Sequence, residues 1–166
     1  DCAQRTMDDK RLKRNNVLMN LLRPRLKTLV RQRIISNTLF QRAANPKVIK
    51  QILKKDYPTG NNIDEELIEI LYKPSQRKNS KEAFRGFINL FDDYLATDLF
   101  EKIKIPIQLI WGDKDPWESL DEAIFWKEKF QNIKSLDIIK GAGHCPHDEK
   151  PEETNNLICK FIQETK

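Results

Sequence analysis

Apolar positions change their spacing near residue 104, and the change divides the chain into two parts. Before residue 104 they recur mainly three and four positions apart, the period of a helix with one buried face. After it comes a short, nearly continuous apolar run at residues 105–111, which ends at Gly112. A second short run at residues 135–139 precedes the glycine-rich turn 141–143. Both runs predict strands, and the first is typical of a strand buried on both faces of a parallel sheet.

The first part is predicted to consist of helices separated by proline and glycine. The stripe from Leu26 to Ile34 repeats at i, i+3, i+4 and i+8 and predicts a helix with one buried side. Asn45 followed by Pro46 is a helix start signal, because asparagine caps an N-terminus and proline suits the first helical position. The turn 57–60 ends that helix. Two further stripes predict the helices that follow: Ile63, Leu67, Ile70 and Leu71; then, after Ser80 as a cap, Phe84, Phe87, Ile88, Phe91 and Leu95.

The second part is predicted to alternate strands and helices. Residues 118–130 form an amphipathic pattern between the two strands, and Pro151 opens a last helix. This order predicts an α/β fold with a parallel, right-handed crossover. The inner side of the middle helix is predicted to carry Leu120, Ala123, Ile124, Trp126 and Phe130. Two strands are too few for a covered sheet and residues 1–104 offer no others, so we expect the C-terminal part of a larger sheet domain.

Composition excludes several classes of protein. With 33% charged and 39% hydrophobic residues the chain has the composition of a soluble globular protein, and no apolar run approaches the roughly 20 residues that span a bilayer. The N-terminus lacks the apolar stretch of a signal peptide, and without a starting Met, Asp1 is expected to mark a cut through a longer protein. The cysteines, Cys2, Cys145 and Cys159, follow no C-x-x-C pattern, which favours free buried thiols in a reducing compartment.

Charge is distributed unevenly along the chain. Residues 1–57 carry fifteen Lys or Arg against four Asp or Glu, whereas residues 58–166 carry fifteen against twenty-one. A basic block of this kind fits nucleic acid, an anionic membrane surface or an acidic partner. The basic residues are interspersed with Leu, Ile and Val at helical spacing, however, which favours a solvated helix face. No nucleic-acid motif is present and aromatic residues are scarce among the basic ones, so no nucleic-acid partner is expected.

The loops after the two strands contain the candidate chemistry. The first contains Asp113 and Asp115, and the second contains His144 next to Gly143. Loops at the carboxyl ends of parallel strands hold the functional residues of open α/β sheets. A carboxylate in one loop and an imidazole in the next predict an acid–base pair, in which the carboxylate accepts the Nδ1 hydrogen and fixes the tautomer. Asp115 is favoured over Asp113, which lies nearer the strand and is expected to stabilise the loop. The alternative for His144 is a purely structural role.

A metal site is a competing interpretation of the second loop. His144, Cys145, His147 and Asp148 all carry potential ligand atoms. The spacing H-C-x-H matches no common zinc site, and the neighbouring proline and charged residues suit a surface loop. No metal and no cofactor are therefore expected.

The two loops resemble those of the α/β-hydrolase superfamily. The resemblance rests on IPIQLIWGDKDPW at residues 105–117 and GAGHCPHDEKPEE at residues 141–153. It implies that Asp115 is the acid and His144 the base of a catalytic triad carried on the last two core strands. Because the superfamily order is nucleophile, acid, base, the nucleophile is expected before residue 1. No G-x-S-x-G occurs in the sequence, so these residues alone are expected to be inactive and to expose an apolar strand edge.

The resemblance also implies a domain division. Residues 1–104 would be a mainly helical cap, with residues 1–4 the tail of a preceding core strand, and residues 105–166 would be the C-terminal part of the core. Within the superfamily, the two loops and the stretch 44–71 are similar to pheophytinase-like hydrolases of chloroplasts and cyanobacteria. That similarity implies an ester substrate with a large apolar body, such as a chlorophyll derivative. It also implies a location in the cyanobacterial cytoplasm or the plastid stroma.

Four aromatic residues are candidates for substrate binding. Phe84, Phe87 and Phe91 form a stripe that would suit an apolar ligand or, alternatively, the core of the cap. Trp117 would line the pocket or pack beneath the cap.

The sequence thus predicts an enzyme that hydrolyses a large apolar carboxylic ester through a Ser-Asp-His triad. Two alternatives stay open. The same fold also supports an aspartate nucleophile, as in epoxide hydrolases and haloalkane dehalogenases. The other alternative is a non-catalytic module whose basic helices, residues 5–55, bind nucleic acid or an anionic membrane. A basic cap that tethers an esterase to a membrane surface would combine membrane contact with catalysis.

Overall fold

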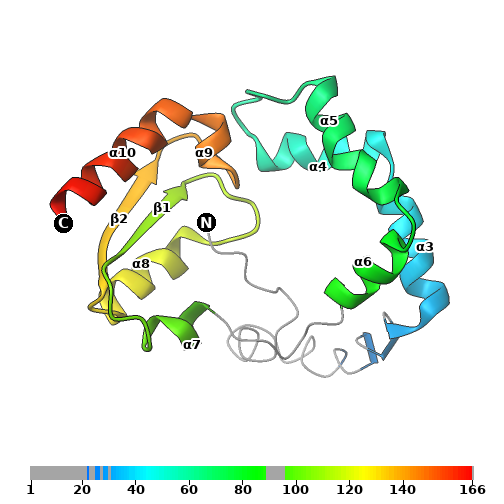
Figure 1. The fold of residues 1–166 in the computed structure, drawn as a ribbon, viewed down its shortest axis with the longest axis horizontal. Coiled ribbons are helices and arrows are strands. Elements are labelled where there is room, and N and C mark those ends of the chain that lie inside the picture. Colours follow the sequence, from blue (N-terminus) through cyan, green and yellow to red (C-terminus); the bar gives the residue numbers. More distant parts are fainter. Residues whose placement is uncertain (1–21, 23–24, 27, 30, 89–95, 166) are drawn as a thin grey trace. The chain divides into compact units, whose positions relative to one another are not determined.

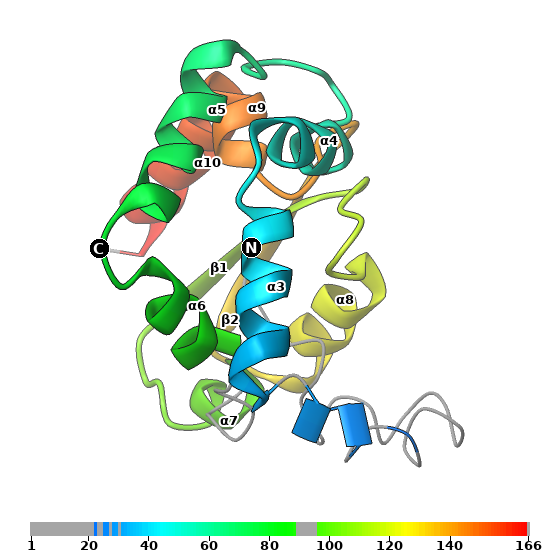
Figure 2. The same ribbon diagram turned by 90° about the vertical axis from the view of Figure 1, so that its right-hand side faces the viewer.

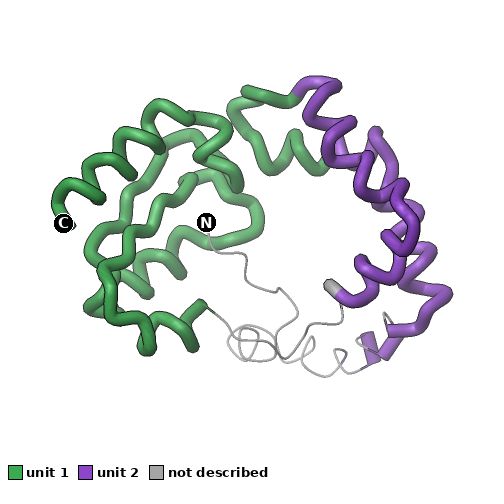
Figure 3. Tube along the Cα trace, viewed as in Figure 1, with its two compact units in different colours: residues 1–3, 52–63, 94–166 green, residues 4–51, 64–93 purple. Residues whose placement is uncertain are grey.

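Two compact units are present in the computed structural model, which describes residues 22, 25, 26, 28, 29, 31–88 and 96–165, without the side chains of 87 and 88. Unit 1 contains residues 52–63 and 96–165, and unit 2 contains the other described residues (Figure 3). The sequence predicts a boundary at residue 104. The segments 52–63 and 96–104 instead belong to the unit that contains the strands, because most of their contacts are with residues of that unit.

A two-stranded parallel sheet forms the centre of unit 1 (Figure 1). β1 (Ile107–Gly112) and β2 (Ile133–Ile139) are paired from Gln108 opposite Ser135 to Gly112 opposite Ile139. The helix α8 (Leu120–Lys129) connects the strands. The α/β arrangement predicted from the alternation of apolar runs is therefore confirmed, and both strands end at the same edge of the sheet.

β1 begins two residues later than the sequence predicts. Pro106 has no amide hydrogen to donate to a strand ladder, so strand pairing starts after it. The amide of Ile107 donates to the carbonyl of Asn132 at 2.8 Å. Ile105 is 70% exposed, and its predicted place in a buried strand is wrong.

The core of unit 1 lies between the sheet and α8. Ala123, Trp126 and Phe130 are buried there, as predicted for the inner side of this helix. Ile124 is 39% exposed, and its predicted inner position is wrong. The three buried residues follow helical spacing, and residue 124 lies about a quarter turn outside their stripe.

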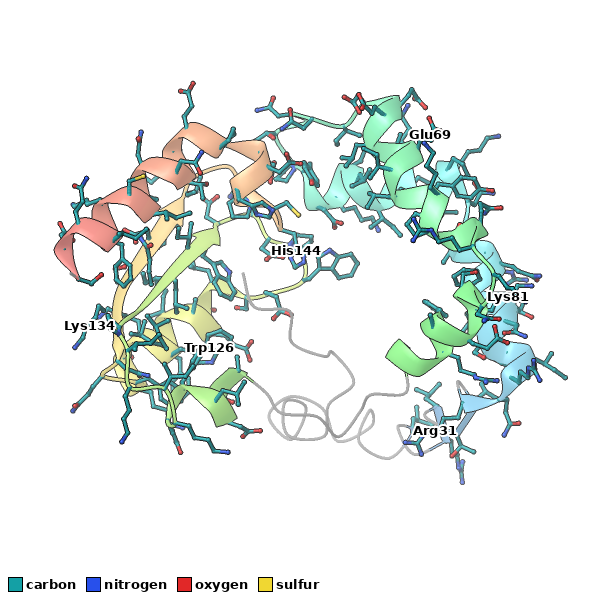
Figure 4. All side chains as sticks on the ribbon, in the orientation of Figure 1. Arg31, Glu69, Lys81, Trp126, Lys134 and His144 are labelled. Carbon is teal, nitrogen blue, oxygen red and sulfur yellow. The ribbon has the colours of Figure 1, made fainter. Side chains whose placement is uncertain are left out.

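An aromatic cluster holds this core together. Trp126, labelled in Figure 4, meets Trp111 of β1 edge-on with ring centroids 5.7 Å apart. Phe100, the last residue of α7 (Ala96–Phe100), lies 5.5 Å from the Trp126 ring and 5.3 Å from the Phe130 ring. Edge-to-face pairs of this kind contribute about 0.5–1.5 kcal/mol each beyond the burial of their area. The segment before β1 is thereby fixed to the strand-containing unit.

The opposite face of the sheet is covered by α10 (Pro151–Glu164). In Figures 1 and 2, α8 and α10 lie on opposite sides of the two strands. Gln108 of β1 donates to the carbonyl of Leu157 in α10 at 3.2 Å and to the carboxylate of Asp137 in β2 at 2.8 Å. The predicted last helix is confirmed, whereas the single turn α9 (Pro146–Glu149) before it is not predicted from the sequence.

The described residues of unit 2 form helices and turns. They comprise α3 (Arg33–Ala43), the first part of α4 (Pro46–Asp56), α5 (Glu65–Tyr72), the 3₁₀ turn η1 (Lys73–Gln76) and α6 (Ser80–Ile88). The start of α4 is as predicted, with the Lys47 amide donating to Asn45 Oδ1 at 2.9 Å. α3 and α6 pack side by side (Figure 2), and the rings of Phe40 and Phe84 lie 5.3 Å apart.

The stripe from Leu26 to Ile34 does not form the predicted buried side. Ile34 is 81% exposed and Leu29 is 51% exposed, and the buried residue of α3 is Ser36. Ser36 and Phe40 lie four positions apart on one side of the helix, and this side packs against α6. Tertiary packing therefore selects a different face from the one that hydrophobicity alone favours.

Two predictions from composition can be compared with the structure. Cys145 and Cys159 are free thiols, but only Cys145 is partly buried, and the predicted burial of Cys159 is wrong because it is exposed on α10. Cys2 lies outside the described residues. In the part of the chain that the structure describes, no helix is both long and apolar enough to cross a bilayer.

Candidate active site

Asp115 lies in a tight turn directly after β1. Its Oδ1 accepts the backbone N–H groups of Trp117 at 2.8 Å and Glu118 at 3.1 Å, which holds the side chain against its own turn. The Asp115 side chain is only 1% exposed. A buried carboxylate requires hydrogen-bond donors around it, and this turn supplies two of them from the backbone.

His144 lies in the loop after β2, where Figure 4 labels it. Gly141 adopts a φ of 78°, a left-handed conformation that reverses the chain after the strand and favours glycine. The backbone N–H of His144 donates to the carbonyl of Asp56 at 2.8 Å. The loop is thus fixed at the histidine itself and not only at the strand end.

Asp115 and His144 are hydrogen-bonded to each other. His144 Nδ1 lies 3.0 Å from Asp115 Oδ2 and 3.1 Å from Oδ1. With Nδ1 donating to the carboxylate, Nε2 carries the lone pair and is the nitrogen that can accept a proton. The His144 side chain is 28% exposed, so a reacting group can reach the ring. This is the geometry that an acid–base relay requires.

Further hydrogen bonds connect the two loops. The Gly141 amide donates to Asp113 Oδ1 at 2.6 Å, and the Lys114 amide donates to the Ala142 carbonyl at 2.9 Å. Asp113 thereby has the loop-stabilising role that the sequence predicts for it. The carboxylate that pairs with the imidazole is that of Asp115.

Two glycines permit very close approach of the backbones. A Cβ atom at Gly112 would lie 2.1 Å from the Gly143 carbonyl oxygen, and a Cβ atom at Gly143 would lie 2.1 Å from the Asp56 carbonyl oxygen. No side chain fits at these distances. The end of β1, the histidine loop and residue 56 therefore pack backbone against backbone.

Replacing Gly143 by alanine is expected to destabilise the full-length protein by about 1–3 kcal/mol, the usual cost of overpacking a close-packed site. The added methyl group would also meet Pro58 Cδ at 2.4 Å, so the histidine loop must move. Urea unfolding of the full-length protein measures the change. Gly86→Ala is a matched control, because a Cβ atom there meets nothing within 4 Å. Equal stability of the two variants would contradict the close packing.

A third segment contacts the histidine loop, and its place there is not predicted from the sequence. We call it the 56–62 segment; it runs from the end of α4 through the turn that precedes α5. The Asp56 carboxylate accepts from the Trp117 indole at 2.5 Å, and the Tyr57 hydroxyl donates to the Asp148 carboxylate at 2.8 Å. Asn62 also donates to Asp148, at 3.1 Å to Oδ1. No periodicity signals such contacts, because the partners are 61 to 91 positions apart in the chain.

The thiol of Cys145, next to the histidine, is a poor candidate for a nucleophile. Burial raises the pKa of Cys145, and the negative charges of Asp56, Asp148 and Glu149 raise it further, although a hydrogen bond with Tyr57 opposes them. A raised pKa leaves less thiolate at neutral pH, and the thiolate is the reactive form. The pKa of Tyr57 is raised as well, first by burial and then by the hydrogen bond to Asp148. Tyr57 therefore serves as a donor.

The predicted substrate-binding residues lie in both units. Trp117, in unit 1, is 46% exposed, and its indole N–H bonds to Asp56. Phe84, in unit 2, is partly buried with its ring against Phe40. The backbone of residue 87 lies in α6, but the side chain of Phe87 and all of Phe91 lie outside the described residues. In the described part of the chain, no group of three or more His, Cys, Asp or Glu side chains is arranged to hold a metal ion.

The fold is that of the C-terminal part of an α/β-hydrolase, and comparisons with known proteins agree. No family model matches the chain. The chain is 26% identical over 133 residues to the chloroplastic pheophytinase of Arabidopsis thaliana, which covers 78% of this chain and 27% of that protein. It is 27% identical over 82 residues to the monoacylglycerol lipase ABHD6 of Mus musculus, covering 49% of this chain and 24% of that protein.

Two further similarities extend this result. Epoxide hydrolase 3 of Xenopus tropicalis is 27% identical over 103 residues, covering 60% of this chain and 27% of that protein. A solved structure of a membrane phospholipase A, a bacterial virulence factor, has the same fold, with a TM-score of 0.58, 20% identity, and coverage of 99% of this chain and 46% of that one. The chain therefore spans about a quarter of the length of the curated relatives named here. The predicted resemblance to α/β-hydrolases is confirmed.

Proposed function

We propose that the full-length protein hydrolyses carboxylic esters through a covalent acyl-enzyme. The observation that carries this proposal is the buried Asp115 carboxylate 3.0 Å from His144 Nδ1, at the shared edge of two parallel strands. In this arrangement a serine outside residues 1–166 attacks the ester carbonyl. His144 Nε2 accepts the serine proton as that bond forms.

The same pair completes both halves of the reaction. The protonated His144 gives its proton to the leaving alkoxide, so an alcohol departs and the acyl group stays on the serine. Water then attacks the acyl-enzyme and gives a proton to Nε2, which returns it to the serine as the acid product leaves. Throughout, Asp115 keeps Nδ1 protonated and stabilises the imidazolium.

The proposed substrate is an ester with a large apolar body. A pheophytinase, a monoacylglycerol lipase and a phospholipase A are among the proteins that resemble this chain, which supports an ester or lipid substrate. We propose that Trp117 and the stripe of Phe84, Phe87 and Phe91 contact the apolar part of this substrate. We also propose that unit 2 is the cap. The basic residues of the cap would provide peripheral contact with an anionic membrane. A location in the cyanobacterial cytoplasm or the plastid stroma stays part of this proposal.

Labelling with a fluorophosphonate tests the reaction class, because this probe reacts with serines activated by a neighbouring base. We expect the full-length protein to be labelled and to hydrolyse p-nitrophenyl esters, with kcat/KM rising from acetate to octanoate. Each buried CH₂ contributes about 0.8 kcal/mol, so chain length reports an apolar pocket. Absence of both labelling and ester turnover would contradict the proposal.

An aspartate nucleophile is the second candidate, favoured by the similarity to epoxide hydrolase 3. It uses the same acid and base but forms an alkyl-enzyme ester. Turnover of an epoxide without fluorophosphonate labelling would favour this candidate over the serine hydrolase.

A further inference from the structure

The carboxylate of Glu149 is buried at the base of the histidine loop and bonded on both oxygens. Glu149 is 2% exposed. Its Oε1 accepts the Gly143 amide at 2.6 Å. Its Oε2 accepts the Thr59 hydroxyl at 2.6 Å and the Thr59 amide at 3.2 Å. Burying a carboxylate is costly unless donors surround it, and here two of three donors come from the 56–62 segment.

Two successive amides of the histidine loop are thereby fixed from two sides. The Gly143 N–H bonds to Glu149, and the His144 N–H bonds to the carbonyl of Asp56 at 2.8 Å. Fixing both amides sets the orientation of the peptide between them, and with it the direction in which the His144 side chain leaves the backbone. The hydrogen bond to Asp115 then sets the rotation of the ring.

The 56–62 segment also reaches the turn that carries the acid. The Asp56 side chain accepts from the Trp117 indole, whose own amide donates to Asp115. One residue of the segment is therefore bonded to the histidine backbone through its carbonyl and to the acid turn through its carboxylate. Both members of the acid–base pair are held by the same external support.

We propose that the buried Glu149–Thr59 pair is a positioning device for His144, which holds the base in line with the nucleophile by anchoring its backbone to the 56–62 segment. Glu149 and Thr59 act through His144 and do not touch the substrate. This inference rests on the proposed function, because it concerns the base of that reaction. A displacement of about 1 Å at a reacting group can lower a rate by about 10²-fold, so loss of the anchor should appear in kcat.

The test compares Thr59→Val with Thr59→Ser in the full-length protein. Valine keeps the shape but removes the hydroxyl donor, whereas serine keeps the donor. We expect Thr59→Val to lower kcat by about 10- to 100-fold with KM changed less than about twofold, and Thr59→Ser to restore most of the activity. Assays are run on p-nitrophenyl esters well below the melting temperature of each variant.

Thr165→Val is the matched control. Like the Thr59 hydroxyl, the Thr165 hydroxyl donates one hydrogen bond, but its acceptor is the backbone carbonyl of Phe161, at 2.7 Å, at the end of α10. A purely structural role for Thr59 predicts equal losses in the valine and serine variants, or a loss of melting temperature without a change in kcat. Either result, or wild-type kcat in Thr59→Val, would overturn the positioning role.

A double-mutant cycle with Glu149→Gln adds a second readout. The glutamine amide group cannot accept from both Gly143 and Thr59 on two oxygens, so one donor loses its partner. From each kcat we calculate the change in activation free energy. We expect the change in the double variant to be smaller than the sum of the changes in the two single variants, because both substitutions break the same Glu149–Thr59 interaction. Additive effects would contradict the coupling. If His144→Ala keeps its activity the proposed function fails, whereas an inactive His144→Ala together with a normal Thr59→Val removes only the positioning device.

Discussion

Replacing His144 by alanine is expected to lower the kcat of the full-length protein on esters by about 10⁴- to 10⁶-fold while the protein stays folded. In the proposed reaction, no group would then accept the proton of the attacking serine and none would protonate the leaving alkoxide. The fold is expected to survive because the backbone bond from residue 144 to Asp56 does not depend on the side chain. The Asp115 carboxylate also keeps the amides of Trp117 and Glu118 as donors.

The chain supplies a control for this experiment, since it contains two histidines. His147 lies three residues further on, is exposed, and stands in α9. His147→Ala should leave kcat within about a factor of two, because exposed substitutions away from a site rarely change stability by more than about 0.5 kcal/mol. Ester turnover and thermal unfolding are measured for both variants. Near-normal turnover in His144→Ala would remove the catalytic assignment.

Asp115→Asn should have the second-largest effect, a fall in kcat of about 10⁴-fold. Asparagine Oδ1 can still accept the backbone amides of Trp117 and Glu118, so the turn should persist. Its NH₂ group then takes the place of the oxygen that faces His144 Nδ1. Because this group is a donor, Nδ1 must become the acceptor, and the proton moves to Nε2. The imidazole is held in the tautomer that cannot act as a base toward the nucleophile.

Asp113→Asn is the control that separates the two candidate acids. The Asp113 side chain accepts one amide, that of Gly141, and an asparagine oxygen can do the same. We expect its kcat to stay close to the wild-type value. A larger loss in Asp113→Asn than in Asp115→Asn would reverse the assignment of the acid. Fluorophosphonate labelling rates give the same comparison without a chosen substrate.

Much of the strand-containing unit could be predicted from the sequence. Its two strands and the helices α8 and α10 are marked by apolar patterns of the right period, and parallel strands place their carboxyl ends at one edge. The meeting of Asp115 and His144 follows from that topology without knowledge of any distance. The errors are local: Pro106 delays β1, and Ile124 lies outside a buried stripe that only the tertiary packing defines.

The support of the histidine loop could not be predicted in the same way. Asp56 and Glu149 are polar residues at helix ends and Thr59 is a polar residue in a turn, positions where polar residues are usually solvated. Their hydrogen bonds join segments about ninety residues apart, and neither periodicity nor a short motif reports such pairing. Gly143 is the one sequence signal for this support. It indicates that another backbone segment packs closely against the loop, but it does not identify that segment.

The grouping of residues 52–63 with the strands has a consequence for recombining this protein with its relatives. An exchange of everything before a junction near residue 104 would carry the 56–62 segment away and leave Glu149 without its Thr59 partners. Junctions at 51/52 and 63/64 would follow the division of the described residues into two units and keep that segment with the loop it supports. The end of α4 and the turn before α5 would thus stay with the loop that carries His144 in any exchange of helices between such proteins.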